Sequence, residues 1–152
     1  MGTNFYMSTN NKDVRDKYFG YDYEIVDTPD WGYEIHIAKT SGGWLPLFQS
    51  HDCFNSIKGL KELYNTGHFV IYDEYNQVYD WPAFEERVIK WNGGVDGAIP
   101  KTYHKVNKDD MFYDPDMPGY TPVSHFTYGN GKYAYLYFKD SDGFEFCGHD
   151  FS

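Results

Sequence analysis

The sequence predicts a single α+β domain over residues 1–152, in which an antiparallel sheet carries two or three helices packed on one face. Three observations lead to this prediction. A chain of 152 residues has the length of one domain and can bury roughly 70% of the surface that it exposes when unfolded. Strand-like alternation recurs near both ends of the chain. Capped helical segments lie between these strands.

The N-terminal part predicts a strand, a helix and a weaker strand. Residues 4–7 include adjacent aromatic side chains, which favour a strand. Residues 9–11 offer capping side chains for a helix over 12–19, and Gly20 can end it. Residues 21–26 alternate weakly, which indicates a further strand.

The segment 33–48 predicts a β-hairpin. Residues 33–38 alternate so that Glu34 and His36 share one face and the apolar side chains share the other. A Gly-rich turn over 39–43 then leads to a returning strand over 44–48. A proline in that strand removes a backbone donor, so we expect the strand at a sheet edge or at a bulge.

Two helices follow, with two strands between them. The segment 56–65 begins with a capping serine and carries an apolar stripe, which predicts a helix. Residues 69–72 and 77–79 are strand-like, with a turn between them. Asp80 can cap the helix predicted over 81–92, which two glycines end.

The last third of the chain predicts a long loop followed by a β-meander. Residues 95–122 contain four prolines and several acids, which indicates a loop or an insertion. The predicted strands of the meander, joined by two Gly-containing hairpin turns, are 125–128, 132–138 and 144–147.

Composition describes an acidic protein that is rich in aromatic residues. The 23 acidic residues exceed the 13 basic residues, which gives a net charge of −10, and aromatic residues make up 21% of the chain. Acidic disordered chains are poor in aromatic residues, so this chain is expected to fold. No apolar run reaches the ~18 residues of a membrane span. The charge repels phosphate groups, so we expect neither nucleic acid nor a membrane as a direct partner.

The hairpin turn offers the best candidate ligand-binding site, made of His36, Lys39, Thr40, Ser41 and Trp44. A Gly-rich turn exposes backbone N–H groups, and the lysine adds a cation, so an anion such as a phosphate could bind there. The tryptophan could stack on a base or ring. The alternative interpretation is an ordinary hairpin whose glycines serve the turn and whose tryptophan belongs to the core.

The two cysteines each lie two positions from a histidine. His51 with Cys53, and Cys147 with His149, supply the ligand types of a tetrahedral zinc site. The spacing within each pair is tighter than in common zinc motifs, so two ordinary cysteines near surface histidines remain the favoured interpretation. We therefore predict no metal and no cofactor. With no secretory leader recognised and too few cysteines for a disulfide framework, we expect a cytoplasmic protein with reduced thiols.

Four segments together resemble a family of uncharacterised small phage-encoded proteins. They are the opening Met-Gly-Thr-Asn-Phe-Tyr over 1–6, the His-Ile-Ala-Lys-Thr-Ser-Gly-Gly-Trp stretch within 34–44, the segment 71–75 and the terminal Asp-Phe-Ser over 150–152. Members of that family also carry a Cys-x-x-Cys pair before the His-Ile motif, whereas this chain has Asp-Thr-Pro-Asp over 27–30. The resemblance implies a phage accessory gene and implies no particular chemistry.

The leading functional hypothesis is a non-enzymatic protein that binds and inhibits a host defence or nucleic-acid-processing protein. An acidic surface could mimic nucleic acid, as in anti-CRISPR-like or anti-restriction-like inhibitors. Residues 109–152 hold eight acids and two lysines. The predicted partner-binding residues are Asp109, Asp110, Asp114 and Asp116. The alternative is a nucleotide-binding protein that sequesters immune signals, or a nucleotide-processing enzyme, with its site at the 36–44 turn. In either case the location expected is the cytoplasm of the bacterial host.

Overall fold

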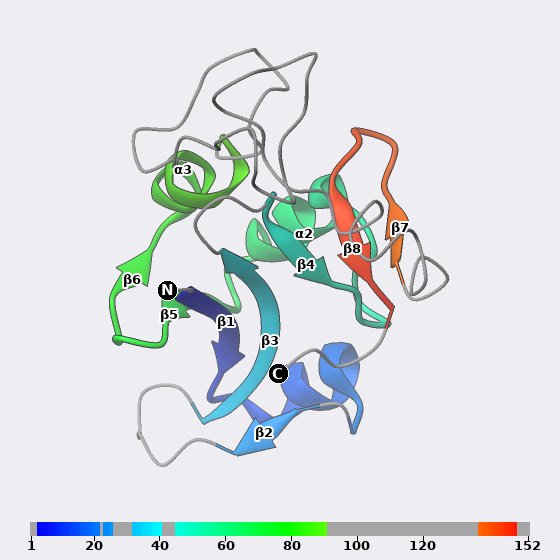
Figure 1. Cartoon of the computed structure of the whole chain (residues 1–152). Coiled ribbons are helices and arrows are strands. Elements are labelled where there is room, and N and C mark those ends of the chain that lie inside the picture. Colours follow the sequence, from blue (N-terminus) through cyan, green and yellow to red (C-terminus); the bar gives the residue numbers. More distant parts are fainter. Residues whose placement is uncertain (1–2, 22, 26–31, 41–44, 91–136, 149–152) are drawn as a thin grey trace, which may run out of the picture.

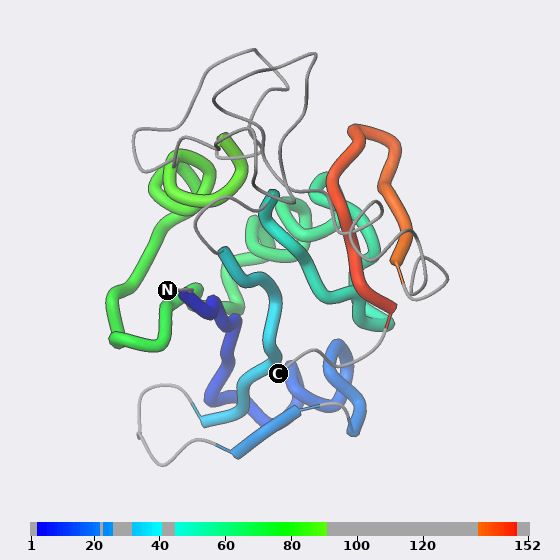
Figure 2. Tube along the Cα trace, in the orientation of Figure 1, coloured from blue at the N-terminus to red at the C-terminus, as the bar shows by residue number. Residues whose placement is uncertain are grey.

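A computed structural model describes residues 3–21, 23–25, 32–40, 45–90 and 137–148, and they form an α+β domain (Figures 1 and 2). Its centre is an eight-stranded sheet with the strand order β6-β5-β1-β3-β4-β8-β7, and β2 pairs with β3 outside this path. The strands are β1 (Thr3–Thr9), β2 (Glu24–Ile25), β3 (Tyr33–Thr40), β4 (Leu47–Gln49), β5 (Val70–Asp73), β6 (Val78–Tyr79), β7 (Tyr137–Lys139) and β8 (Glu145–Cys147). The predicted fold class is confirmed.

The N-terminal strand β1 lies in the middle of the sheet, between β3 and β5. Both of its pairings are antiparallel. The register with β3 shifts between Phe5 and Tyr6, because Phe5 faces Ala38 while Tyr6 faces His36. Ile37 is therefore the extra residue of a β-bulge on β3.

One pairing of the sheet is parallel and departs from the predicted antiparallel arrangement. The predicted hairpin is present, since Ala38 of β3 faces Phe48 of β4, but β4 also pairs in parallel with β8. β4 is consequently an interior strand, and the expectation of an edge or a bulge at Pro46 was wrong. The strand begins at Leu47, directly after the proline, so the missing N–H interrupts no described pairing.

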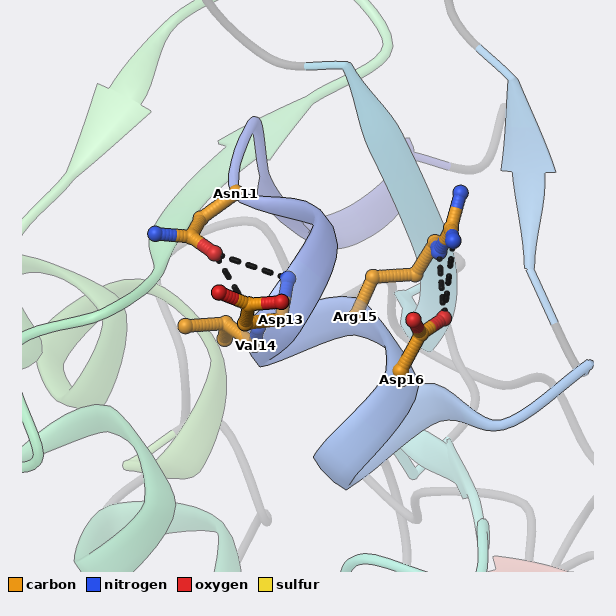
Figure 3. A network of polar contacts seen from close by, with 5 residues as sticks. All are labelled: Asn11, Asp13, Val14, Arg15 and Asp16. Carbon is orange, nitrogen blue, oxygen red and sulfur yellow. Dashed lines mark hydrogen bonds and ion pairs between the residues drawn. The ribbon is translucent and has the colours of Figure 1, made fainter.

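The helices begin at the capping residues that the sequence predicts, but the third helix ends at Ile89, before the predicted end at residue 92. They are α1 (Lys12–Val14), continued by the π-helical η1 (Arg15–Phe19); α2 (Ile57–Tyr64); and α3 (Trp81–Phe84), continued by the π-helical η2 (Glu85–Ile89). The Asn11 side chain accepts from the N–H groups of Asp13 and Val14 (Figure 3). Ser56 and Asp80 cap the other two helices in the same way.

The helices pack on one face of the sheet, as predicted. Alternate residues of the strands, among them Phe5, Phe48 and Phe146, join the helical residues Leu60 and Phe84 in one hydrophobic cluster. All five side chains are fully buried. We call this the core face of the sheet, and the opposite side the outer face.

The turn between β7 and β8 is tied to the start of α2 by Asp140. Its Oδ1 accepts from the N–H groups of Asp142 and Phe144, and its Oδ2 accepts from the N–H of Ile57 at 2.8 Å. This carboxylate thereby stabilises a hairpin and a helix N-terminus together. The predicted insertion over 95–122 and the strand over 125–128 lie outside the described residues.

Candidate functional site

Polar and ionisable side chains gather on the outer face of β3, β1 and β5. Cross-strand partners point to the same face of a sheet, and the register pairs Ser8 with Glu34, Tyr6 with His36 and Asn4 with Lys39. Tyr6 also faces Tyr72 of β5. We call the four residues Tyr6, Glu34, His36 and Tyr72 the tyrosine cluster.

The β-bulge determines which face Lys39 occupies. In an unbroken strand Lys39 would share a face with Ile37, which belongs to the hydrophobic core. The extra residue at the bulge turns Lys39 to the outer face, together with His36. The structure thus brings two of the predicted ligand-binding residues onto the same face.

The aromatic rings of the tyrosine cluster are in contact. The Tyr6 and His36 rings stack with their centroids 4.9 Å apart and their planes at 28°. The Tyr6 and Tyr72 centroids lie 5.7 Å apart. The Tyr72 hydroxyl donates a hydrogen bond to Oε2 of Glu34, which connects β5 and β3 across the central strand. This face is therefore a packed aromatic and carboxylate layer.

Burial raises the pKa values of the acidic groups in the cluster. Desolvation is the main cause of the raised pKa of Glu34; the nearby Glu24 raises it further, and the hydrogen bond from Tyr72 opposes the rise. The pKa of the Tyr72 hydroxyl is raised by desolvation and then by its bond to Glu34. Desolvation and the nearby Glu34 and Glu74 also raise the pKa of Tyr6. Such a cluster favours protonated groups, which can donate hydrogen bonds.

The other residues of the predicted ligand-binding set do not join His36 and Lys39 in the described structure. Thr40 pairs with Thr3, is only 6% exposed and lies on the core face, opposite to His36 and Lys39. The strand simply continues to Thr40, where the sequence predicted the turn. Ser41 and Trp44 lie outside the described residues.

The parallel pairing of β4 and β8 brings the two cysteine-containing segments together. Gln49 faces Cys147, and the Ser50 N–H donates to the Cys147 carbonyl at 3.0 Å. Nε2 of His51 lies 2.7 Å from the carbonyl oxygen of His36. Among the described residues no three metal-ligating side chains come together, and no disulfide joins Cys53 to Cys147. His149 lies outside the described part of the chain.

The turn between β5 and β6 is a second candidate site, and its conformation is held by Asp73. This buried carboxylate accepts from the N–H groups of Tyr75 and Gln77 and from the Tyr79 hydroxyl. Asn76 adopts a positive φ of 66°, a conformation that asparagine tolerates better than most residues. The backbone of the turn is thus ordered by internal hydrogen bonds.

Apolar side chains are exposed on this hairpin. Tyr75 is 68% exposed and Val78 is 57% exposed. Glu74 and Asp80 flank them and are also exposed. We call the residues 74–80 the acidic hairpin. Figure 1 shows it at the periphery of the molecule, where β5 turns into β6.

Acidic residues outnumber basic residues around the acidic hairpin, although the Arg87 guanidinium lies close enough to the Tyr79 hydroxyl to lower its pKa. Residues 62–86 contain six acids and no lysine or arginine. Two further apolar residues that are exposed in the described part of the chain, Tyr21 and Ile25, lie in a segment of mixed charge, since residues 12–25 contain three bases and four acids. There Arg15 forms an ion pair with Asp16 (Figure 3). The guanidinium carbon of Arg15 lies 4.5 Å from the centre of the Tyr33 ring. The acidic hairpin therefore has a larger local excess of acidic residues than this second apolar surface.

Comparison of the chain with known protein families, with curated proteins and with solved structures finds no match. None of the helices that the structure describes has both the length and the apolar character needed to cross a membrane. The predicted partner-binding residues Asp109, Asp110, Asp114 and Asp116 lie outside the described residues. The acidic hairpin was recognised in the sequence only as a turn, although the missing bases over 62–86 were visible there.

Proposed function

We propose that this protein acts without catalysis, by binding a basic surface of a host protein and inhibiting that protein. The observation that carries the proposal is the acidic hairpin, where exposed apolar side chains stand among carboxylates in a stretch whose acids outnumber its bases, with Arg87 reaching Tyr79 from η2. Aromatic anchors with a charged rim are typical of protein interfaces. The net charge of −10 adds long-range attraction for a basic partner.

The resemblance to phage-encoded proteins favours a host defence or nucleic-acid-processing protein as the target. Proteins of this kind present basic surfaces to phosphates, and an acidic protein can occupy such a surface in place of nucleic acid. Inhibition would then follow from occupation of the surface, and no reacting group would be needed.

Affinity capture from a lysate of the bacterial host tests the proposal. We expect the tagged protein to retain a nuclease, a restriction enzyme or another defence protein at low salt, and to release it as the salt concentration rises. The captured protein, once purified, should lose activity in proportion to the fraction bound. Retention of no such protein at low salt, or binding without inhibition, would overturn the proposal.

A variant of the predicted partner-binding residues extends this experiment. Neutralising Asp109, Asp110, Asp114 and Asp116 to asparagine should weaken the association and reduce its salt dependence. Unchanged affinity of the purified partner would remove these four residues from the contact surface.

A second candidate function is binding of a nucleotide at the outer face of the sheet. The bulge at Ile37 favours it, because it places Lys39 on the same face as His36 and the stacked Tyr6 ring. A lysine beside aromatic rings is suited to a phosphate joined to a base. Such a protein could sequester a nucleotide signal without turnover.

Thermal unfolding in the presence of nucleotides distinguishes the second function from the first. Nucleotide binding predicts a midpoint that rises with ligand concentration. The Lys39→Ala variant should lose this rise while its own midpoint stays close to that of the wild type. Lys61→Ala, on α2, is the matched control and should keep the rise. A wild-type midpoint that no nucleotide shifts would exclude this function.

A further inference from the structure

We infer that the acidic hairpin is the docking surface for an extended segment of the partner in which basic and apolar residues alternate. The inference rests on the proposed function and specifies which surface performs it and what chemistry the partner presents there. Three features carry it: a turn ordered before binding, a local excess of acidic over basic residues, and backbone groups that face away from β5 on the terminal strand of the described sheet.

The turn is ordered without a partner. Asp73 accepts three hydrogen bonds inside the hairpin, and the Glu74 N–H donates to the Asn4 carbonyl at 3.0 Å. Oε1 of Glu74 accepts in return from the Asn4 N–H at 2.9 Å. These bonds hold the exposed Tyr75 on a fixed backbone, so binding would order few additional groups at this site.

The charge around the hairpin is complementary to a basic segment. Glu74 and Asp80 lie at the two ends of the surface, and Tyr75 and Val78 lie between them. Carboxylates at the rim would attract arginine or lysine side chains, while the two apolar side chains would contact apolar residues of the segment.

The register of the hairpin turns backbone groups of β6 away from β5, toward the edge of the described sheet. The Asp73 N–H donates to the Gln77 carbonyl at 3.0 Å, so that pair is hydrogen-bonded. In an antiparallel ladder the next pair, Tyr72 with Val78, is then not hydrogen-bonded, and the N–H and C=O of Val78 point away from β5. In the described sheet β6 is the terminal strand. An extended segment could therefore add beside Val78.

A defined peptide tests this surface directly. The probe is a capped nonapeptide of alternating arginine and leucine, titrated into isotope-labelled protein and followed by backbone amide chemical shifts. We expect the largest shifts over residues 74–80. A peptide with glutamate in place of arginine should produce none, and methylation of the leucine amide nitrogens should weaken binding because it removes backbone donors without changing charge.

Four variants of the hairpin preserve its internal bonds. Tyr75→Ser and Val78→Ser remove exposed apolar groups. Glu74→Gln retains an oxygen for the Asn4 N–H, and Asp80→Asn retains the cap on the Ala83 N–H. Each should raise the dissociation constant of the Arg-Leu peptide by at least about fivefold. Tyr21→Ser and Ile25→Ser, at the more exposed apolar surface, are the controls and should leave the constant unchanged.

The outcomes separate this inference from the proposed function. If the control variants weaken peptide binding as much as the hairpin variants do, or if the shifts fall elsewhere, the hairpin is not the docking surface. The same four variants are then compared in binding to the purified host protein. Normal binding by all four would overturn the inference and leave the proposed function standing. Absence of any captured host protein would overturn the proposed function itself.

Discussion

At the scale of single residues, the half-buried carboxyl group of Glu34 on the outer face makes the stability of the fold depend on pH. It accepts the hydrogen bond from Tyr72, and desolvation raises its pKa above the ordinary value of 4.5. A carboxyl group whose pKa is higher in the folded protein stabilises the fold below its unfolded pKa. That contribution is lost as the pH rises through the folded pKa.

We therefore expect Glu34→Gln to increase the free energy of unfolding, relative to the wild type, most strongly at neutral pH. The amide oxygen can still accept from the Tyr72 hydroxyl, and the variant carries no charge that burial would penalise. Urea unfolding at steps from pH 4 to pH 7 should show the wild type losing stability relative to the variant above about pH 4.5. Glu62→Gln, on the exposed side of α2, serves as the control. A constant difference between variant and wild type across this range would contradict the prediction.

Tyr79 gives a corresponding prediction at alkaline pH. Desolvation and its bond to Asp73 raise the pKa of the hydroxyl from 10.0 to about 12. Its contribution to stability is present below pH 10 and is lost as the pH rises through about 12. Tyr79→Phe should lack this component of alkaline destabilisation. At pH 8 it should be less stable by about 1–3 kcal/mol, because one oxygen of the buried Asp73 loses its donor.

Urea unfolding at pH 8 and at steps between pH 10 and pH 12 checks the Tyr79 prediction. Tyr75→Phe removes an exposed hydroxyl from the same hairpin and should match the wild type at pH 8. If Tyr79→Phe and the wild type lost stability in parallel between pH 10 and pH 12, the assignment of this titration to Tyr79 would be wrong.

At the scale of elements, Asp140 couples a hairpin to a helix. Asp140→Ala removes the acceptor for the Ile57 N–H and for two N–H groups of the β7–β8 turn. We expect a loss of about 1–2 kcal/mol, the upper part of the range for a helix cap. Amide hydrogen exchange should quicken both at the start of α2 and in the turn.

The matched control for Asp140 is its neighbour in the same turn. Asp142→Ala changes an exposed side chain and keeps the backbone N–H that bonds Asp140, so it should cost less than about 0.5 kcal/mol. Asp140→Asn should recover part of the loss, because its amide oxygen can still accept. Faster exchange confined to the turn in Asp140→Ala would show that the bond to Ile57 contributes nothing.

At the scale of the whole molecule, the net charge of −10 acts on stability and on binding in opposite directions. Self-repulsion destabilises the compact state, and added salt screens it. The thermal midpoint of the free protein should therefore rise by a few degrees as NaCl increases from about 10 mM to about 200 mM. Affinity for a basic partner should fall over the same range. A free protein whose midpoint falls with NaCl would contradict this account of its charge.

The sequence by itself determined the local elements of this protein. Helix starts at Asn11, Ser56 and Asp80 depend on a side-chain oxygen and on N–H groups two or three residues away, so they can be recognised in the chain. The end of the first helix at Gly20, with a φ of 58°, is equally local. The α+β class could be predicted because strand alternation and helix capping are both patterns that extend over only a few residues.

Only the tertiary structure decided which strands are neighbours and which side chains meet. The central position of β1 depends on a pairing such as Asn4 with Glu74, seventy positions apart, and the parallel pairing of β4 with β8 spans a still longer stretch of chain. Alternation predicts which residues of a strand share a face, but it does not indicate which other strand will pair with it. The bulge at Ile37 places Lys39 on the outer face, and this bulge exists only when β1 and β3 are paired. The tyrosine cluster is therefore a product of strand pairing, because three separate strands supply its four residues.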